Sequence, residues 1–186
     1  MHDLSPITPL GRAEAVRETH GPVTLTEVTD RALASVAARL GRENETAAML
    51  TDLLGEPPPA PARHCGGAVS AFWMGPDQWM MDAPYDADPD LAAQLAGRAK
   101  GVASVTEQTD AWCRFDLTGD GLAEVLERLC PADIRSYAGG EAVRTSIDHL
   151  GCFLICRTPK HLSILGPRSA AGSLHHALMT AMRSAH

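Results

Sequence analysis

The clearest pattern of apolar and polar positions in this chain lies in residues 111–117. Every second side chain is apolar and the others form a second face: one set is Ala111, Cys113, Phe115 and Leu117, the other Trp112, Arg114 and Asp116. A period of two is typical of a strand with one buried face. We therefore predict a strand here, with Trp112 either covering a second layer or facing another chain.

The residues after this strand predict a helix. Thr118 offers a side-chain oxygen as an N-cap, and two glycines make the turn. Apolar side chains then recur at spacings of three and four, which places Leu122, Val125, Leu126 and Leu129 on one helix face. Pro131 is expected to end the helix, because proline cannot continue the helical hydrogen bonds.

Similar patterns predict the remaining elements. Strands are expected at residues 23–28, 68–74, 78–82, 143–148, 150–156 and 161–165, and helices at 44–54, 91–99 and 168–182. Residues 31–40 fit both a helix stripe and a strand face, so the pattern alone leaves this segment open.

The order of these elements indicates the fold class. Pairs of strands, each followed by a helix, are typical of α+β proteins with antiparallel sheets and helices packed on one face. Residues 1–22 are polar and contain three prolines, so we expect an extended N-terminal arm. Residues 23–186 are expected to form a single domain, or two lobes, 23–101 and 102–186, that share a core.

Composition and charge exclude several function classes. The net charge is -7 and the 16 basic residues are scattered, which argues against binding to nucleic acid. No apolar stretch reaches the roughly 18 to 20 residues that cross a bilayer, and the N-terminus has no signal-peptide pattern. Five irregularly spaced cysteines do not read as a disulfide framework. We expect a cytoplasmic protein without a membrane segment.

Glycine and cysteine patterns give only weak candidates for a functional site. Gly119, Asp120 and Gly121 are too few for a phosphate-binding loop, and a strand-to-helix turn explains them. Cys152 and Cys156 share a strand face without the spacing of a zinc site, so we expect both to be buried apolar side chains.

Histidine pairs are equally weak candidates for metal ligands. His175 and His176 are neighbours on a helix, so their side chains point about 100° apart and cannot hold one metal ion together. His64 beside Cys65 is a weak metal hint, and a pair of loop residues is the simpler interpretation.

Catalytic combinations are no stronger. Ser146, Asp148 and His149 contain the residue types of a hydrolase triad, without a nucleophile elbow or an oxyanion hole. Paired carboxylates could come from Asp110, Asp116, Asp120 and Asp133. Helix-start and turn roles explain Asp120 and Asp133. The residues therefore predict no catalytic, cofactor-binding or metal-binding position on this chain.

Four motifs together resemble a known family. They are GPDQW (residues 75–79), TDAWCRFDLTG (109–119), CPAD (130–133) and RTSIDHLGCFLICRT (144–158). In this order and spacing they are similar to the gamma subunit of heterotetrameric sarcosine oxidase, over about residues 23–182. The strand-turn-helix unit is also similar to the folate-binding aminomethyltransferase domain of the glycine cleavage system. That resemblance implies a strand at 31–40.

The resemblance implies a role within a larger complex. Such a complex oxidises sarcosine to glycine, passes the one-carbon unit to tetrahydrofolate and produces hydrogen peroxide. FAD, FMN and NAD are expected on the larger alpha and beta subunits, and zinc on the small delta subunit. This chain would be a non-catalytic subunit that contacts alpha directly, with beta and delta in the same complex.

Two other hypotheses remain open from the sequence. The chain could be a stand-alone folate- or pterin-binding module, or a small hydrolase that uses Ser146 and His149. In isolation, a surface meant for a partner subunit would also favour a homo-oligomer.

Overall fold

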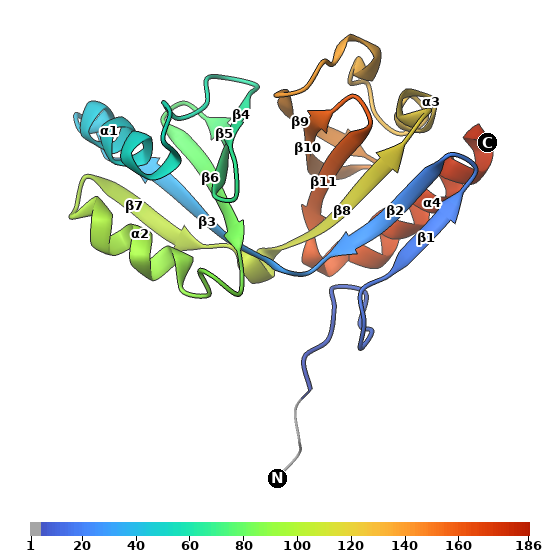
Figure 1. Cartoon of the computed structure of the whole chain (residues 1–186), viewed down its shortest axis with the longest axis horizontal. Helices are drawn as coiled ribbons and strands as arrows, with labels where there is room; N and C mark the ends of the chain where they lie inside the picture. The colour runs from blue at the N-terminus through green and yellow to red at the C-terminus, as the bar shows by residue number, and fades with distance from the viewer. Residues whose placement is uncertain (1–4) are drawn as a thin grey trace. The chain divides into compact units, whose positions relative to one another are not determined.

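The computed structural model describes residues 5–186, which form two compact units. Unit 1 contains the described residues up to Thr29 together with Asp110–Gly139 and Arg144–His186. Unit 2 contains Asp30–Thr109 and Gly140–Val143. The chain therefore begins in unit 1, builds most of unit 2 and returns to unit 1 (Figure 1).

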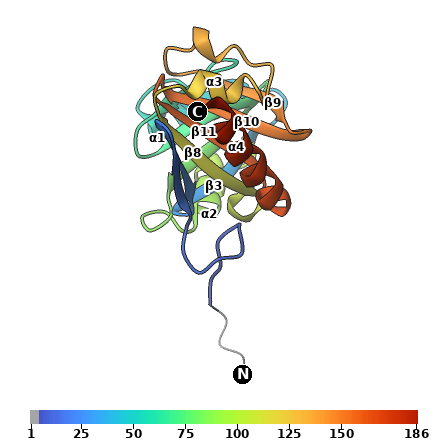
Figure 2. The ribbon, with the colours of Figure 1, turned by 90° about the vertical axis from the view of Figure 1, so that its right-hand side faces the viewer.

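Unit 1 is built around a six-stranded antiparallel sheet in the order β1-β2-β8-β11-β10-β9. Its strands are β1 (Arg17–His20), β2 (Val23–Val28), β8 (Trp112–Gly119), β9 (Ala142–Ile147), β10 (Leu150–Thr158) and β11 (His161–Pro167). The helices are α3 (Leu122–Leu126) and α4 (Ala171–Ala185), with short 3-10 turns at Thr109–Ala111, Ile134–Ser136 and Arg168–Ala170. Figure 2 shows α4 lying across strands of this sheet.

The core of unit 1 lies between α4 and β8. The alternate β8 residues Cys113, Phe115 and Leu117 are buried, as are Leu174, Leu178 and Met182 along one side of α4. The His175 ring contacts the Phe115 ring, which shows that these β8 side chains face α4. The alternation predicted for this strand is confirmed for Cys113, Phe115 and Leu117, whereas Ala111 is exposed in the 3-10 turn before β8.

Unit 2 has a five-stranded sheet in the order β4-β5-β6-β3-β7. Its elements are β3 (Arg31–Ala38), α1 (Glu43–Leu54), β4 (His64–Gly66), β5 (Ser70–Gly75), β6 (Gln78–Pro84), α2 (Leu91–Ala99) and β7 (Ala103–Glu107). Leu50 of α1 and Leu95 of α2 are buried in one cluster with Val36 and Met81 of the sheet. The proline-rich segment is tied to this core, because the buried Trp79 Nε1 donates to the Pro59 carbonyl at 3.0 Å.

The two units share one topology. In unit 2, β3-α1-β5-β6-α2-β7 forms a split βαβ pattern with sheet order β5-β6-β3-β7. In unit 1, β8-α3-β10-β11-α4 takes the same places, and β2, from the N-terminal side of the chain, supplies the last strand. Unit 1 is thus completed by a strand that precedes the whole of unit 2.

The predicted α+β class with antiparallel sheets is confirmed. The corrections concern the C-terminal end and the N-cap of one predicted helix. Residues 31–40 contain β3, as the family resemblance implied. The helix expected to reach Leu129 ends at Leu126, followed by a turn in which the Cys130 amide donates to the Leu126 carbonyl. Thr118 lies in β8 rather than capping that helix. Strands β1, β4 and β7 were not predicted.

The N-terminal arm predicted at residues 1–22 differs in part from the structure. Its last residues form β1, and residues 5–16 form turns and irregular backbone; residues 1–4 lie outside the described part. The buried Glu27 carboxylate holds this segment, because it accepts from the Leu10 amide at 3.0 Å and from the Val16 amide at 3.1 Å.

The predicted lobes, 23–101 and 102–186, have different boundaries from the two units. The main divisions lie at residues 29/30 and 109/110 rather than at 101/102, and Gly140–Val143 also belong to unit 2. The reason is backbone pairing: β7 follows residue 101 but hydrogen bonds with β3 of unit 2, whereas β2 pairs with β8 of unit 1. Hydrophobic periodicity does not report which strands pair.

Gly119 provides a test of this pairing. Its φ is +124°, and a Cβ there would lie 2.0 Å from the Pro22 carbonyl oxygen, so we expect Gly119→Ala to lower the free energy of unfolding by more than about 2 kcal/mol. Urea unfolding monitored by circular dichroism measures this change. Gly97→Ala in α2 is the control, because its Cβ would meet no atom within 4 Å and alanine favours a helix. Equal stability of the two variants would contradict the close approach of Gly119 to Pro22.

Candidate functional site

A cluster of charged side chains lies on the face of the unit 1 sheet opposite α4. Phe115 faces α4, so its neighbours Arg114 and Asp116 point to the other face. Asp116 lies opposite Ser163 of β11 in the strand register. We call Arg114, Asp116, Arg157, His161 and Ser163, which come from β8, β10 and β11, the Asp116 cluster.

Hydrogen bonds connect all five members of the cluster. Arg114 donates Nε to Asp116 Oδ1 at 2.8 Å and Nη2 to Oδ2 at 2.9 Å, which is a bidentate pair. His161 Nε2 lies 2.7 Å from the same Oδ2. Ser163 Oγ accepts from Arg114 Nη2 at 3.1 Å and from Arg157 Nε at 3.3 Å. The cluster therefore fixes side chains of three strands relative to one another.

The electrostatics of the cluster depend on the Asp116 carboxylate. Burial favours the neutral form of Asp116, but the hydrogen bonds from His161 and Arg114, together with the Arg114 charge, outweigh burial and hold its pKa well below the ordinary value. Asp116 is therefore ionised at neutral pH and already accepts from Arg114 and His161. A carboxylate in this state is a poor general base, and its effect is to orient the two side chains.

Trp112 lies on the same face of the sheet. Its ring centroid is 5.3 Å from that of Phe153 in β10, and the Arg144 guanidinium carbon lies 5.9 Å from the Phe153 centroid. The structure shows Trp112 half-buried against a side chain of its own sheet, and both positions predicted for it stay predictions.

The four aspartates considered as paired carboxylates are not joined into one site. Asp120 pairs with Lys160 at 2.7 Å, and both side chains are exposed. Asp110 lies 3.6 Å from Arg168, and Asp133 precedes a 3-10 turn where its carbonyl accepts from Ser136. Asp116 is the one described aspartate of the four that contributes to the cluster.

The three residues considered as a hydrolase triad lie in the hairpin formed by β9 and β10. Asp148 and His149 have φ values of +47° and +66° and form the turn between β9 and β10, and Ser146 is exposed near the end of β9. Two successive positive φ values are typical of a tight hairpin turn. The turn explains why Asp148 and His149 stand together in the sequence.

The cysteines and histidines lie in separate environments. Burial raises the pKa of the Cys113 and Cys152 thiols to about 11, and Cys156 is buried as well. Burial, with Glu56 nearby, also raises the pKa of Cys65 to about 11, so this thiol is protonated at neutral pH.

His175 and His176 diverge as predicted. His175 Nε2 lies 3.5 Å from Glu18, whereas His176 is one of the residues that line a groove along α4. Within residues 5–186, no three His, Cys, Asp or Glu side chains are grouped closely enough to hold a metal ion. None of the helices in this same range is long and apolar enough to span a membrane.

Sequence reasoning missed most of the Asp116 cluster. Asp116 was considered as a carboxylate, but its partners were not identified. His161 and Ser163 do alternate with Leu162 and Ile164 along β11, which marks a polar face. That signal identifies the cluster only when the register between β8 and β11 is known.

Two solved structures resemble this chain over most of its length. No protein-family model and no curated protein sequence matches it. A chain of heterotetrameric sarcosine oxidase from Corynebacterium sp. U-96, in complex with pyrrole 2-carboxylate, has a TM-score of 0.76 and 26% sequence identity, and the match covers 87% of this chain and 84% of that one. This chain is similar to a subunit of sarcosine oxidase. The resemblance found in the four sequence motifs is thus confirmed.

The second structure confirms the fold. Glycine cleavage system aminomethyltransferase T from Bartonella henselae has a TM-score of 0.65 and 16% identity, and the match covers 89% of this chain and 47% of the transferase. This chain therefore spans about half the length of that enzyme.

Acid unfolding tests the Asp116 cluster. We expect Asp116→Asn to lower the free energy of unfolding at neutral pH by about 3 kcal/mol, because Arg114 loses a buried partner. The native pKa of Asp116 lies below its unfolded value, so the stability it contributes is present above about pH 4 and is lost as the pH falls further. Urea unfolding of both proteins across the acid range measures the difference.

The control for this prediction is Asp120→Asn, which removes an exposed ion pair with Lys160 and should leave stability unchanged. A pH-independent difference between the native protein and Asp116→Asn would contradict an ionised, paired Asp116.

Proposed function

We propose that this chain is the gamma subunit of a heterotetrameric sarcosine oxidase, where it supports assembly and carries no redox centre of its own. The observation that supports this proposal best is the extent of the likeness: it covers 87% of this chain and 84% of the oxidase chain. A match of that length extends through both units, which supports a correspondence with most of one subunit. The match to the aminomethyltransferase covers only 47% of that enzyme.

The proposed complex oxidises sarcosine to glycine, transfers the one-carbon unit to tetrahydrofolate and releases hydrogen peroxide in the cytoplasm. FAD, FMN, NAD and zinc belong to the other subunits in this proposal, and this chain binds alpha directly. The charged groups support a structural role, because Asp116 already accepts hydrogen bonds from Arg114 and His161. Ser163 likewise bridges Arg114 and Arg157 within the sheet.

Co-expression tests the proposal. The tagged chain is produced together with the alpha, beta and delta subunits, and the purified material is examined by gel, absorption spectrum and peroxide assay. We expect a yellow complex of four chains that produces peroxide from sarcosine. Omitting this chain should reduce recovery of the intact complex. A tagged chain recovered alone and colourless would contradict the proposal.

A stand-alone folate-binding module is the alternative, favoured by the transferase-like fold. In that case tetrahydrofolate should quench tryptophan fluorescence in a saturable way, through Trp112 on the sheet face opposite α4. Trp112→Phe should reduce the change, whereas Trp73→Phe, in β5 of unit 2, serves as the control. A flat titration of the isolated chain would exclude the alternative and leave the subunit proposal intact.

A further inference from the structure

A groove of about 490 Å³ runs along the side of α4 in unit 1. One wall is α4 itself, through Ala177, Thr180, Ala181 and Ser184. The other wall comes from the turn after α3 and from the β9–β10 hairpin. All of these elements belong to unit 1, so the groove is a property of this unit alone.

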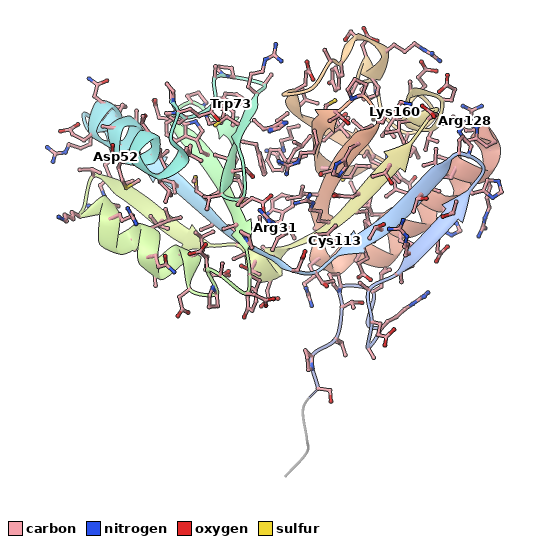
Figure 3. All side chains as sticks on the ribbon, in the orientation of Figure 1. Arg31, Asp52, Trp73, Cys113, Arg128 and Lys160 are labelled. Carbon is pink, nitrogen blue, oxygen red and sulfur yellow. The ribbon has the colours of Figure 1, made fainter. Side chains whose placement is uncertain are left out.

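A positive charge lies at one end of the groove. The Arg128 Nε atom donates to Ser184 Oγ at 3.3 Å, and Arg128 Nη1 also donates to the Glu124 carbonyl. These contacts hold the guanidinium beside the C-terminal end of α4, where Figure 3 shows it.

A negative charge lies toward the other end. A Cβ on Gly166 would meet Leu174 of α4 at 2.6 Å and Cys152 of β10 at 3.4 Å, so the start of β10 lies beside the first half of α4. Asp148 is in the turn that immediately precedes β10. Leu174 and Ser184 are ten residues apart, or about 15 Å along a helix, so the start of β10 and Arg128 lie beside different parts of α4.

The middle of the groove permits close approach of another helix. Thr180 is exposed between the charged ends, and Ala177 and Ala181 beside it are nearly covered. Small side chains let helix axes approach to about 8 Å, because no long side chain has to be displaced.

We propose that this groove is a self-association surface whose occupant is α4 of a second copy of this chain. The two α4 helices pack antiparallel about a two-fold axis near Thr180. This orientation places Arg128 of each copy against Asp148 of the other, so one surface complements itself. A parallel arrangement would bring like charges together at both ends. This self-association does not depend on the oxidase role, and it concerns the chain before it meets any other subunit.

Sedimentation equilibrium of the full chain tests the proposal by charge reversal. The native protein should form a dimer that dissociates on dilution over roughly a hundredfold range and weakens with salt. Arg128→Glu and Asp148→Arg should each weaken the dimer by about tenfold or more, because each places like charges in contact. The double variant restores opposite charges at both ends, so it should recover the native dissociation constant to within about threefold.

Matched controls make the same charge changes on exposed residues of unit 2. Asp52→Arg on α1, labelled in Figure 3, matches Asp148→Arg, and Arg98→Glu on α2 matches Arg128→Glu. Both controls should leave the dissociation constant unchanged. Thr180→Arg, which puts two positive charges near the two-fold axis, should abolish the dimer while the circular dichroism spectrum stays native.

Three results would overturn the proposal. One is a monomer at every concentration, and another is a dimer that Thr180→Arg leaves intact. The third is a double variant no stronger than the single ones. If the native chain is monomeric and Arg128→Glu instead reduces its recovery with the alpha subunit, the groove takes a helix of a different chain. Failure of the oxidase proposal would show in the peroxide assay and would leave the dimer measurement unaffected.

Discussion

The pairing of β2 with β8 is the constraint on which unit 1 depends. These strands are separated in the chain by most of unit 2, yet their register is continuous from Val23 opposite Gly119 to Val28 opposite Arg114. The entropic cost of closing the long segment between β2 and β8 grows only slowly with its length. The two strands must nevertheless meet before their contacts can stabilise the pairing. Once formed, the pairing gives β8 a neighbour on each side and brings Glu27 to the backbone amides of the N-terminal segment.

Local patterns along the chain predicted much of this fold because they report burial. Phe115 and Leu117 alternate with polar side chains, and the apolar run in β10 marks a strand covered on both faces. Strands β1, β4 and β7 were not predicted, and the reasons are physical. In β7 only Ala103 is fully buried, while β1 and β4 are short edge strands whose backbone pairing, rather than their side chains, defines them. The helix α3 is shorter than its apolar stripe because spacing does not report where the hydrogen bonds stop.

The Asp116 cluster shows the limit of sequence reasoning about a site. Arg114 and Asp116 are two residues apart, so strand geometry alone places them on one face. Their other partners, His161 and Ser163, lie more than forty residues away in the chain and join them only through the register of β11. A lone aspartate in a strand therefore carries little information, whereas the same aspartate bonded to Arg114 and His161, with a lowered pKa, is a defined structural centre.

The character of this centre bears on how the protein works. Both oxygens of the Asp116 carboxylate accept hydrogen bonds, Oδ1 from Arg114 and Oδ2 from Arg114 and His161. The cysteines of the core are likewise held as protonated thiols by burial. The hydrogen bonds of the Asp116 cluster join side chains of β8, β10 and β11. Charges of both signs also line the groove along α4, where Arg128 is held by Ser184 and Asp148 lies in the exposed β9–β10 turn.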